Sequence, residues 1–262
     1  MDLNLKNKVI LVTGGAKGIG EAICRVLANE QAFPVIIGRN EEDNKKLLAE
    51  IVNSGGRGAQ LVAELSDPQA CENVIEEAYG LHGRIDGLVN NAGVNDGVGL
   101  ENGNYKDFML SIHRNLVHYY LLAHYALPYL KESVGSIVNI SSKTGETGQG
   151  GTSAYAAANG GRNALTREWA VELLPFNIRV NAIIVAECWT PQYERWIETL
   201  PDASNKLEEI NARIPLQNRM TRPEEIANTV AFLLSDKSSH TTGQLLYVDG
   251  GYVHLDRALL GQ

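Results

Sequence analysis

Short apolar runs rich in β-branched residues alternate with stretches of helical periodicity along almost the whole chain. Parallel strands need a long crossover connection, which a helix usually supplies, so this alternation predicts a parallel sheet with helices on both faces. We expect one α/β domain over residues 1–262, because no linker or internal repeat interrupts the pattern. The expected strands are Lys8–Thr13, Phe33–Gly38, Ala59–Ala63, Ile85–Asn90, Val134–Ile140, Ile178–Val185 and Leu245–Val248.

The composition is that of an ordinary globular protein, with 262 residues, 44% hydrophobic residues and a net charge of −8. This charge argues against a nucleic-acid partner, which requires a basic face. No apolar run reaches the roughly 20 residues of a membrane span, and the N-terminus lacks an apolar signal core. Three scattered cysteines (Cys24, Cys71 and Cys188) favour a reducing compartment, so we expect a cytoplasmic protein without membrane contact.

A glycine-rich turn joins the first expected strand to a helix. Gly14, Gly18 and Gly20 lie in a GxxxGxG spacing, and apolar residues at helical spacing follow them. Glycines let the backbone turn tightly and approach a ligand, and a helix N-terminus offers free N–H groups to a pyrophosphate. This context predicts a dinucleotide-binding loop.

The end of the second expected strand indicates which dinucleotide is bound. An acidic residue there favours NAD, whereas a basic one can hold the 2′-phosphate of NADP. Here Gly38 is neutral, Arg39 is basic, and Lys17 adds a positive charge in the glycine loop. We therefore expect NADP to be favoured over NAD.

A serine and a tyrosine follow the fifth expected strand. Ser142 follows this apolar run, and Tyr155 lies at the start of an alanine-rich helix, with a Gly/Thr/Ser-rich loop between them. Both hydroxyls can converge at the mouth of the sheet, where a phenol can carry a proton and a second hydroxyl can hold a carbonyl oxygen.

A long helix is expected from Tyr105 to Leu130. His113, His118 and His124 do not stack on one helix face, so no metal site is expected. The many apolar and aromatic residues predict a helix buried on more than one side and used in a subunit contact.

The combined motifs resemble the short-chain dehydrogenase/reductase family: TGGAKGIG, NNAG at residues 90–93, NISS at residues 139–142, Tyr155, RVNAI at residues 179–183 and VDGG at residues 248–251. The resemblance implies a Rossmann-type doubly wound sheet of about seven strands, hydride transfer between nicotinamide and an alcohol or carbonyl, and a homotetramer. It implies a catalytic set of Asn115, Ser142, Tyr155 and Asn159. The implied cofactor contacts are Gly14, Lys17, Gly18, Ile19, Gly20, Arg39, Glu64, Leu65, Asn91, Gly93, Tyr155, Asn159, Cys188 and Thr190.

The fourth catalytic position departs from the family, because the usual YxxxK motif ends here in Asn159. In the family this lysine holds the nicotinamide ribose and favours ionisation of the tyrosine; a neutral amide supplies no charge. We expect slow turnover, an alkaline pH optimum and a gain of roughly 10–1000-fold in kcat for Asn159→Lys. A dinucleotide-binding protein with little catalysis is the alternative, whether the asparagine is natural or introduced. Lesser departures are Val185-Ala186 for Pro-Gly, Glu64 for Asp and Gly38 for the NAD-binding carboxylate.

Within the family, several segments look most like L-fucose dehydrogenases and their sugar-acid relatives: NNAGVNDGVGLE, SSKTGETGQGGTS, AECWTPQYERW and VHLDRAL. This likeness implies a sugar or sugar-acid substrate and a small lid at about residues 186–215. The expected substrate contacts are Asn95, Ser142, Lys143, Gln149, Tyr155, Glu187 and Trp189. A rival substrate is a 3-deoxy-2-keto sugar acid, whose carboxylate would pair with Lys143 or Arg195.

Overall fold

Seven parallel strands form one sheet in the order β3-β2-β1-β4-β5-β6-β7. The computed structural model describes residues 2–256. The chain runs outward from β1 to β3 and then returns to continue from β4 to β7, so the direction of winding reverses between β1 and β4. This confirms the predicted doubly wound sheet, whose ligand crevice lies at such a reversal. The strands are β1 (Val9–Thr13), β2 (Phe33–Gly38), β3 (Ala59–Val62), β4 (Gly87–Asn90), β5 (Ser136–Ser142), β6 (Arg179–Val185) and β7 (Leu245–Val248).

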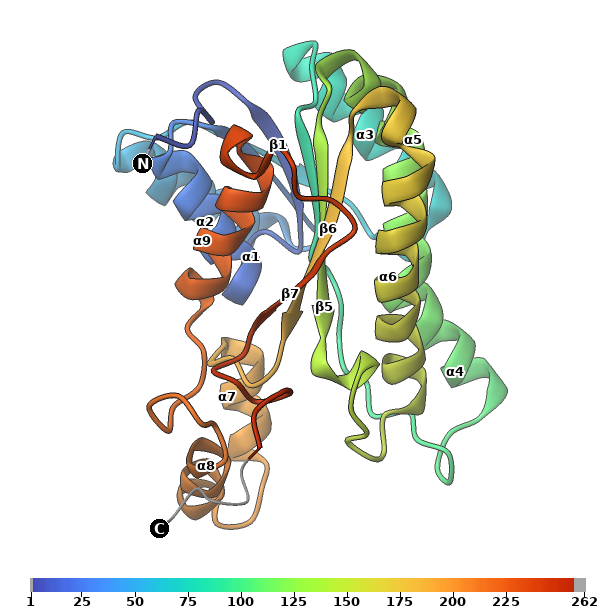
Figure 1. Cartoon of the computed structure of the whole chain (residues 1–262), viewed down its shortest axis with the longest axis vertical. Coiled ribbons are helices and arrows are strands. Elements are labelled where there is room, and N and C mark those ends of the chain that lie inside the picture. The colour runs from blue at the N-terminus through green and yellow to red at the C-terminus, as the bar shows by residue number, and fades with distance from the viewer. Residues whose placement is uncertain (1, 257–262) are drawn as a thin grey trace.

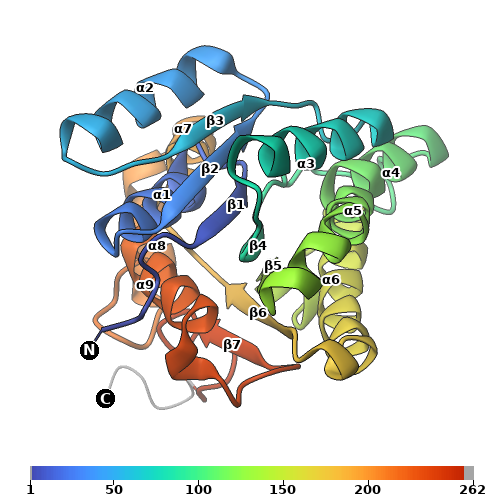
Figure 2. The same cartoon turned by 90° about the horizontal axis from the view of Figure 1, so that it is seen from above.

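Helices cover both faces of the sheet (Figures 1 and 2). One face packs against α1 (Gly18–Asn29), α2 (Glu41–Asn53) and α9 (Pro223–Leu234). The other face packs against α3 (Pro68–His82), α5 (His118–Ser133) and α6 (Ser153–Glu172). The core therefore has two layers, one on each side of the sheet.

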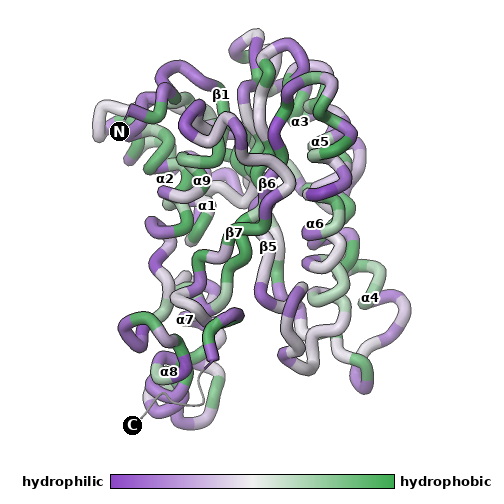
Figure 3. The backbone as a smooth tube through the Cα atoms, viewed as in Figure 1, coloured by the Kyte–Doolittle hydropathy of each residue, from purple (hydrophilic) through white to green (hydrophobic). Residues whose placement is uncertain are grey.

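The central strands are apolar on both sides, as a sheet covered on both faces requires. All five residues of β1 are buried, and so are the four of β4. Figure 3 shows hydrophobic residues gathered along the central strands and hydrophilic ones along the outer loops and α8 (Ala203–Ala212). Within residues 2–256, no helix combines the length and apolarity needed to cross a bilayer.

The fifth strand begins two residues later than expected. Val134 adopts a left-handed conformation (φ 52°) at the end of α5, and the backbone N–H of Gly135 donates to the Leu130 carbonyl. The strand can start only after this turn, at Ser136, which pairs with Arg179 of β6. The strand also ends two residues later than expected, because Ser141 and Ser142 still pair with Ile184 and Val185 of β6.

The expected long helix from Tyr105 to Leu130 is divided into three pieces. α4 covers Tyr105–Ile112, a π-helical turn (η1) covers His113–Val117, and α5 follows. A π-turn changes the hydrogen-bond partners of the backbone locally and is frequent at functional sites. Asn115 lies at the centre of this turn and is buried.

Candidate active site

The serine and the tyrosine lie on two elements that pack together at one end of the sheet. Ser142 ends β5 opposite Val185 of β6, and its Oγ accepts a hydrogen bond from the Thr144 backbone at 3.3 Å. Tyr155 is in the first turn of α6, which packs against β5, β6 and the short helix η2 (Lys143–Gly145). Both residues therefore lie at the carboxyl end of the sheet, and the convergence of their hydroxyls stays a prediction.

The glycine loop forms a cradle that side chains would fill. Gly14 and Gly18 have positive φ angles of 60° and 57°, and a Cβ at Gly20 would lie 2.1 Å from the Gly14 carbonyl. The α1 N-cap, Lys17, makes no side-chain capping bond, so the first N–H groups of this helix stay available. These features fit the pyrophosphate of a dinucleotide. Ile19, the remaining expected contact in this loop, packs against the core.

Two further loops border this cradle. Asn91 donates to the carbonyls of Thr13 (2.8 Å) and Gly14 (3.2 Å), which ties the end of β4 to the glycine loop. A Cβ at Gly18 would lie 3.4 Å from Thr190, whose hydroxyl caps α7 (Pro191–Glu198). Cys188 is buried, and burial raises the pKa of its thiol to about 12, so the thiol stays protonated.

The end of β2 leaves little room for a side chain. A Cβ at Gly38 would lie 2.5 Å from Oδ1 of Asn44 in α2. Arg39 is exposed beside it, whereas Lys17 forms an ion pair with Asp43 at 2.6 Å. Of the two basic residues proposed to hold a 2′-phosphate, Lys17 therefore already has a carboxylate partner.

The end of β3 supplies Glu64 and the buried Leu65. Although partial burial opposes it, hydrogen bonds from the Ser66 hydroxyl (2.8 Å) and backbone (3.1 Å) hold the pKa of Glu64 below its usual value. Glu64 is therefore ionised near neutral pH, and its side chain turns back onto its own loop.

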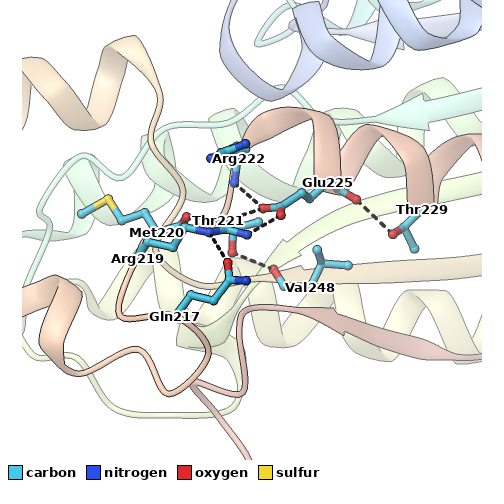
Figure 4. Close-up of polar contacts among 8 residues, drawn as sticks. All are labelled: Gln217, Arg219, Met220, Thr221, Arg222, Glu225, Thr229 and Val248. Carbon is cyan, nitrogen blue, oxygen red and sulfur yellow. Dashed lines mark hydrogen bonds and ion pairs between the residues drawn. The ribbon is translucent and has the colours of Figure 1, made fainter.

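Arg219, Arg222 and Glu225 form a clasp of charged residues at the start of α9 (Figure 4). Arg219 donates two hydrogen bonds to Glu225, at 2.9 and 2.6 Å, and the Arg222 backbone donates a third at 2.8 Å. Between the two arginines, Thr221 exchanges backbone hydrogen bonds with Glu187 and Trp189. This clasp therefore positions the segment that carries Cys188 and Thr190.

Asn159 is fully buried, with 0% of its surface exposed. Its Nδ2 donates to the Tyr155 carbonyl (2.8 Å) and to the Thr144 hydroxyl (3.3 Å), and its Oδ1 accepts from Arg162 (3.0 Å). Both polar atoms of the amide thus have protein partners. The contact of Asn159 with the cofactor stays a prediction.

Arg162, which no sequence motif marks, is buried in the site and is only 3% exposed. Its guanidinium donates to the carbonyls of Asn115 (2.6 Å) and Ile140 (3.2 Å) and to the Asn159 amide. The Cζ atom lies 4.3 Å from the centre of the Tyr119 ring and 6.0 Å from the centre of the Tyr155 ring. The sequence feature that could have indicated Arg162 is a charged residue seven positions after Tyr155, on a helix that packs against the sheet.

Asn115 is also held from several sides. Its Oδ1 accepts from the Val94 backbone at 2.8 Å, and its Nδ2 donates to the Ser111 carbonyl at 3.0 Å. Its backbone carbonyl accepts from Arg162 at 2.6 Å. A Cβ at Gly93 would lie 2.8 Å from the same guanidinium, so this loop also needs a glycine.

An ion pair lies at the mouth of the site. Lys143, 8% exposed, pairs with Glu187, whose second oxygen accepts from the Tyr193 hydroxyl at 2.7 Å. Burial and the Glu187 charge both raise the pKa of Tyr193, so it remains a neutral donor. Lys143 is therefore not a free cation for a substrate carboxylate. Three further expected substrate contacts, Asn95, Gln149 and Trp189, are exposed. Arg195, the alternative partner for a substrate carboxylate, is exposed as well.

The histidines do not form a metal site. Residues 2–256 contain no group of three or more His, Cys, Asp or Glu side chains placed to hold an ion. His118 is buried, and desolvation together with the nearby Arg162 charge lowers its pKa to about 3. Its Nε2 must donate to the Arg114 carbonyl at 3.0 Å, so the neutral ring fixes the π-turn.

The fold, the glycine cradle and the two hydroxyls define an oxidoreductase that uses a dinucleotide. Residues 14–253 match the family model described as "Enoyl-(Acyl carrier protein) reductase". With this match, the chain belongs to the short-chain dehydrogenase/reductase family, whose members use NAD(H) or NADP(H).

Individual relatives carry several activities. The chain is 37% identical to 3-oxoacyl-(acyl-carrier-protein) reductase FabG of Thermotoga maritima, over 96% of this chain and 100% of that protein. It is 31% identical to L-fucose dehydrogenase of Bos taurus, over 96% and 91% of the two chains. The crystal structure of Cj0485 dehydrogenase superposes with a TM-score of 0.94 at 46% identity and covers 100% of both chains.

Proposed function

We propose that this protein oxidises a hydroxyl group of a neutral sugar, with L-fucose as the best candidate. The observation that supports a neutral sugar is the Lys143–Glu187 pair at the mouth of the site. A carboxylate that accepts beside an ammonium that donates can fix two neighbouring hydroxyls of a polyol, whereas their charges cancel toward an anionic ligand. Similarity to a bovine L-fucose dehydrogenase supports the same choice.

In the proposed reaction, Tyr155 takes the proton from the reacting hydroxyl while Ser142 donates a hydrogen bond to its oxygen. A bound nicotinamide would supply the hydride acceptor. Asn115 shapes the π-turn beside both groups. The loop at about residues 186–215, which carries Glu187 and Trp189, acts as a small lid over the sugar.

A substrate panel tests this proposal. L-Fucose, other aldoses and a 3-deoxy-2-keto sugar acid are offered with NADP and with NAD, and cofactor reduction is followed by absorbance. We expect the neutral sugars to be oxidised with the higher kcat/KM. Faster turnover of the acid would favour the rival substrate, and cofactor binding without any turnover would favour a binding protein.

The cofactor preference is proposed to be NADP, held at its 2′-phosphate by Arg39. A guanidinium on a partly exposed phosphate contributes about 1–3 kcal/mol as a charge-assisted contact. Titration of both cofactors should show tighter NADP binding, and Arg39→Gln should remove the difference. Tighter NAD binding by the unmodified chain would contradict this assignment.

We propose a homotetramer located in the cytoplasm. Apolar side chains on the helical face away from the sheet remain exposed, among them Tyr120 of α5 (51%) and Val171 of α6 (65%). Such surface is expected to pair across two-fold axes. Light scattering should give a multiple of the chain mass of 28.5 kDa, and a monomer mass at micromolar concentration would overturn the proposal.

A further inference from the structure

Arg162 is a buried cation without a carboxylate partner. No ion pair joins it to an acidic residue within residues 2–256. Its partners are two backbone carbonyls, two amide oxygens and the face of the Tyr119 ring, all of them neutral. Burying an uncompensated charge is costly, so a negative charge that forms nearby would be strongly favoured.

The nearest group that can become negative during the proposed reaction is Tyr155. Residues 155, 159 and 162 lie on one side of α6, since they are spaced by four and three positions. The guanidinium of Arg162 lies one turn beyond the position of the family's lysine and reaches back toward it, within 3.0 Å of the Asn159 oxygen. It lies 6.0 Å from the centre of the Tyr155 ring.

We propose that Arg162 supplies the positive charge that position 159 lacks and thereby stabilises the phenolate of Tyr155. This inference rests on the proposed dehydrogenase function. Arg162 acts through Tyr155 and touches no reacting atom, so it is a positioning residue. Asn159 then has a defined task, because its Oδ1 orients the guanidinium while its Nδ2 is fixed by Tyr155 and Thr144.

The proton balance differs from that of a lysine-based site. In sugar oxidation the hydroxyl proton would go to the Tyr155 phenolate, the carbon–hydrogen bond would break as the hydrogen leaves with its electron pair as hydride for a bound nicotinamide, and the carbon–oxygen bond would become a carbonyl. Arginine keeps its proton at all working pH values. Tyr155 must therefore release its proton to solvent by a route that does not pass through residue 162.

Other titratable groups face this region and must be considered in any pH profile. His118 and Tyr119 lie on the α5 side, and Tyr119 is neutral because burial raises its pKa to about 12. Lys143 and Glu146 come from the segment after β5, where Glu146 accepts from Asn163 of α6. Glu64 lies beyond His118. Of the two buried cations in this region, Lys143 has an ion-pair partner and Arg162 has none.

The test combines removal of the charge with its return at the family position. Arg162→Gln should lower kcat for L-fucose with NADP by about 10–100-fold at neutral pH, with a smaller change in KM, and should shift the pH optimum upward. Arg162→Leu should be at least as slow. Adding Asn159→Lys to Arg162→Leu should recover about tenfold or more, because a lysine there meets no second cation.

A second readout does not need a substrate. The tyrosinate absorbance titration of the unmodified chain, after subtraction of that of Tyr155→Phe, reports ionisation of Tyr155, and Arg162→Gln should move it to higher pH. Arg167→Gln, a change at an exposed arginine of the same helix, serves as the matched control and should move neither readout.

The outcomes separate the two proposals. An unchanged tyrosinate titration in folded Arg162→Gln would overturn the inference, and so would a double variant no faster than Arg162→Leu. If the unmodified chain oxidises no sugar while the titration still shifts, the proposed substrate fails and the role of Arg162 stands.

Discussion

Lys143 and Arg162 are both buried cations near the expected site of reaction, but their charges are compensated differently. Lys143 follows Ser142 and has a carboxylate, Glu187, that neutralises it. Arg162 lies on the helix of Tyr155 and has only neutral partners. A paired cation can hold a neutral substrate in place throughout a reaction. An unpaired one is most useful when a negative charge appears beside it, so the two regions are suited to binding and to chemistry respectively.

The largest effect on stability is expected from Asn159→Lys in the unmodified chain. The sequence alone predicted a gain in kcat for this change, but the structure places the Asn159 oxygen 3.0 Å from the Arg162 guanidinium. Two cations would meet in a fully buried site, at a cost of about 3–5 kcal/mol in unfolding free energy. Denaturant unfolding measures the loss, and Asn159→Met controls for side-chain length. If Asn159→Lys and Asn159→Met are equally stable, the two cations do not repel each other in the folded protein and the prediction is wrong.

Glu187→Gln should have the next largest effect, because it leaves Lys143 buried without its partner. We expect a loss of about 2–4 kcal/mol in unfolding free energy, since breaking a buried pair costs more than replacing it. Lys143→Met combined with Glu187→Gln should regain more than half of that loss. If the single and double variants are equally stable, the pair is not the reason that Lys143 is buried.

The neutral His118 beside Arg162 makes stability depend on pH. Its folded-state pKa of about 3 lies below the usual 6.5, so the unfolded chain binds an additional proton between these values. Stability therefore falls as the pH decreases through this window, by up to about 1.4 kcal/mol per pH unit. His118→Gln keeps a donor for the Arg114 carbonyl and should flatten this slope. Chemical denaturation between pH 6 and pH 4 provides the measurement, and an unchanged slope would mean that other groups cause it.

The smallest effect is expected at the Arg219–Glu225 clasp, which is charged but partly exposed, with 32% and 39% of the side chains accessible. Hydrogen bonds from Arg219 and Arg222 lower the pKa of Glu225 to about 2, so its contribution is present above pH 4.5 and lost toward pH 2. After allowance for solvent screening, Glu225→Gln should cost about 1 kcal/mol at neutral pH. A thermal unfolding scan would reveal it. A loss as large as that of Glu187→Gln would remove the distinction between buried and exposed pairs.

The fold could be predicted well because its signals are local. The strands are marked by short runs rich in apolar residues, of which β1 is an example, and the glycine turn between β1 and α1 is specific for its context. The π-turn at Asn115 could not be predicted, since the apolar pattern continues through it without a change of period. The start of β5 depended on the left-handed Val134, a conformation that valine seldom adopts.

Candidate residues for the site could be named from the sequence, but their contacts could not. Asn115, Ser142 and Tyr155 follow from motifs, whereas Arg162 is bound mainly by backbone carbonyls, which every residue carries and no sequence pattern marks. The Lys143–Glu187 pair joins positions 44 residues apart. Such pairs depend on how β5 and β6 end beside each other, and only the folded chain shows this.

The one-turn spacing between positions 159 and 162 also constrains how such a sequence can arise. Starting from a lysine at 159, an arginine gained first at 162 would meet that lysine, and an asparagine gained first at 159 would leave Tyr155 without a nearby cation. The first of these single steps would lower stability, and the second would lower turnover. The two residues are therefore expected to be inherited together, and a lineage that has crossed to the arginine arrangement has no easy single-step return.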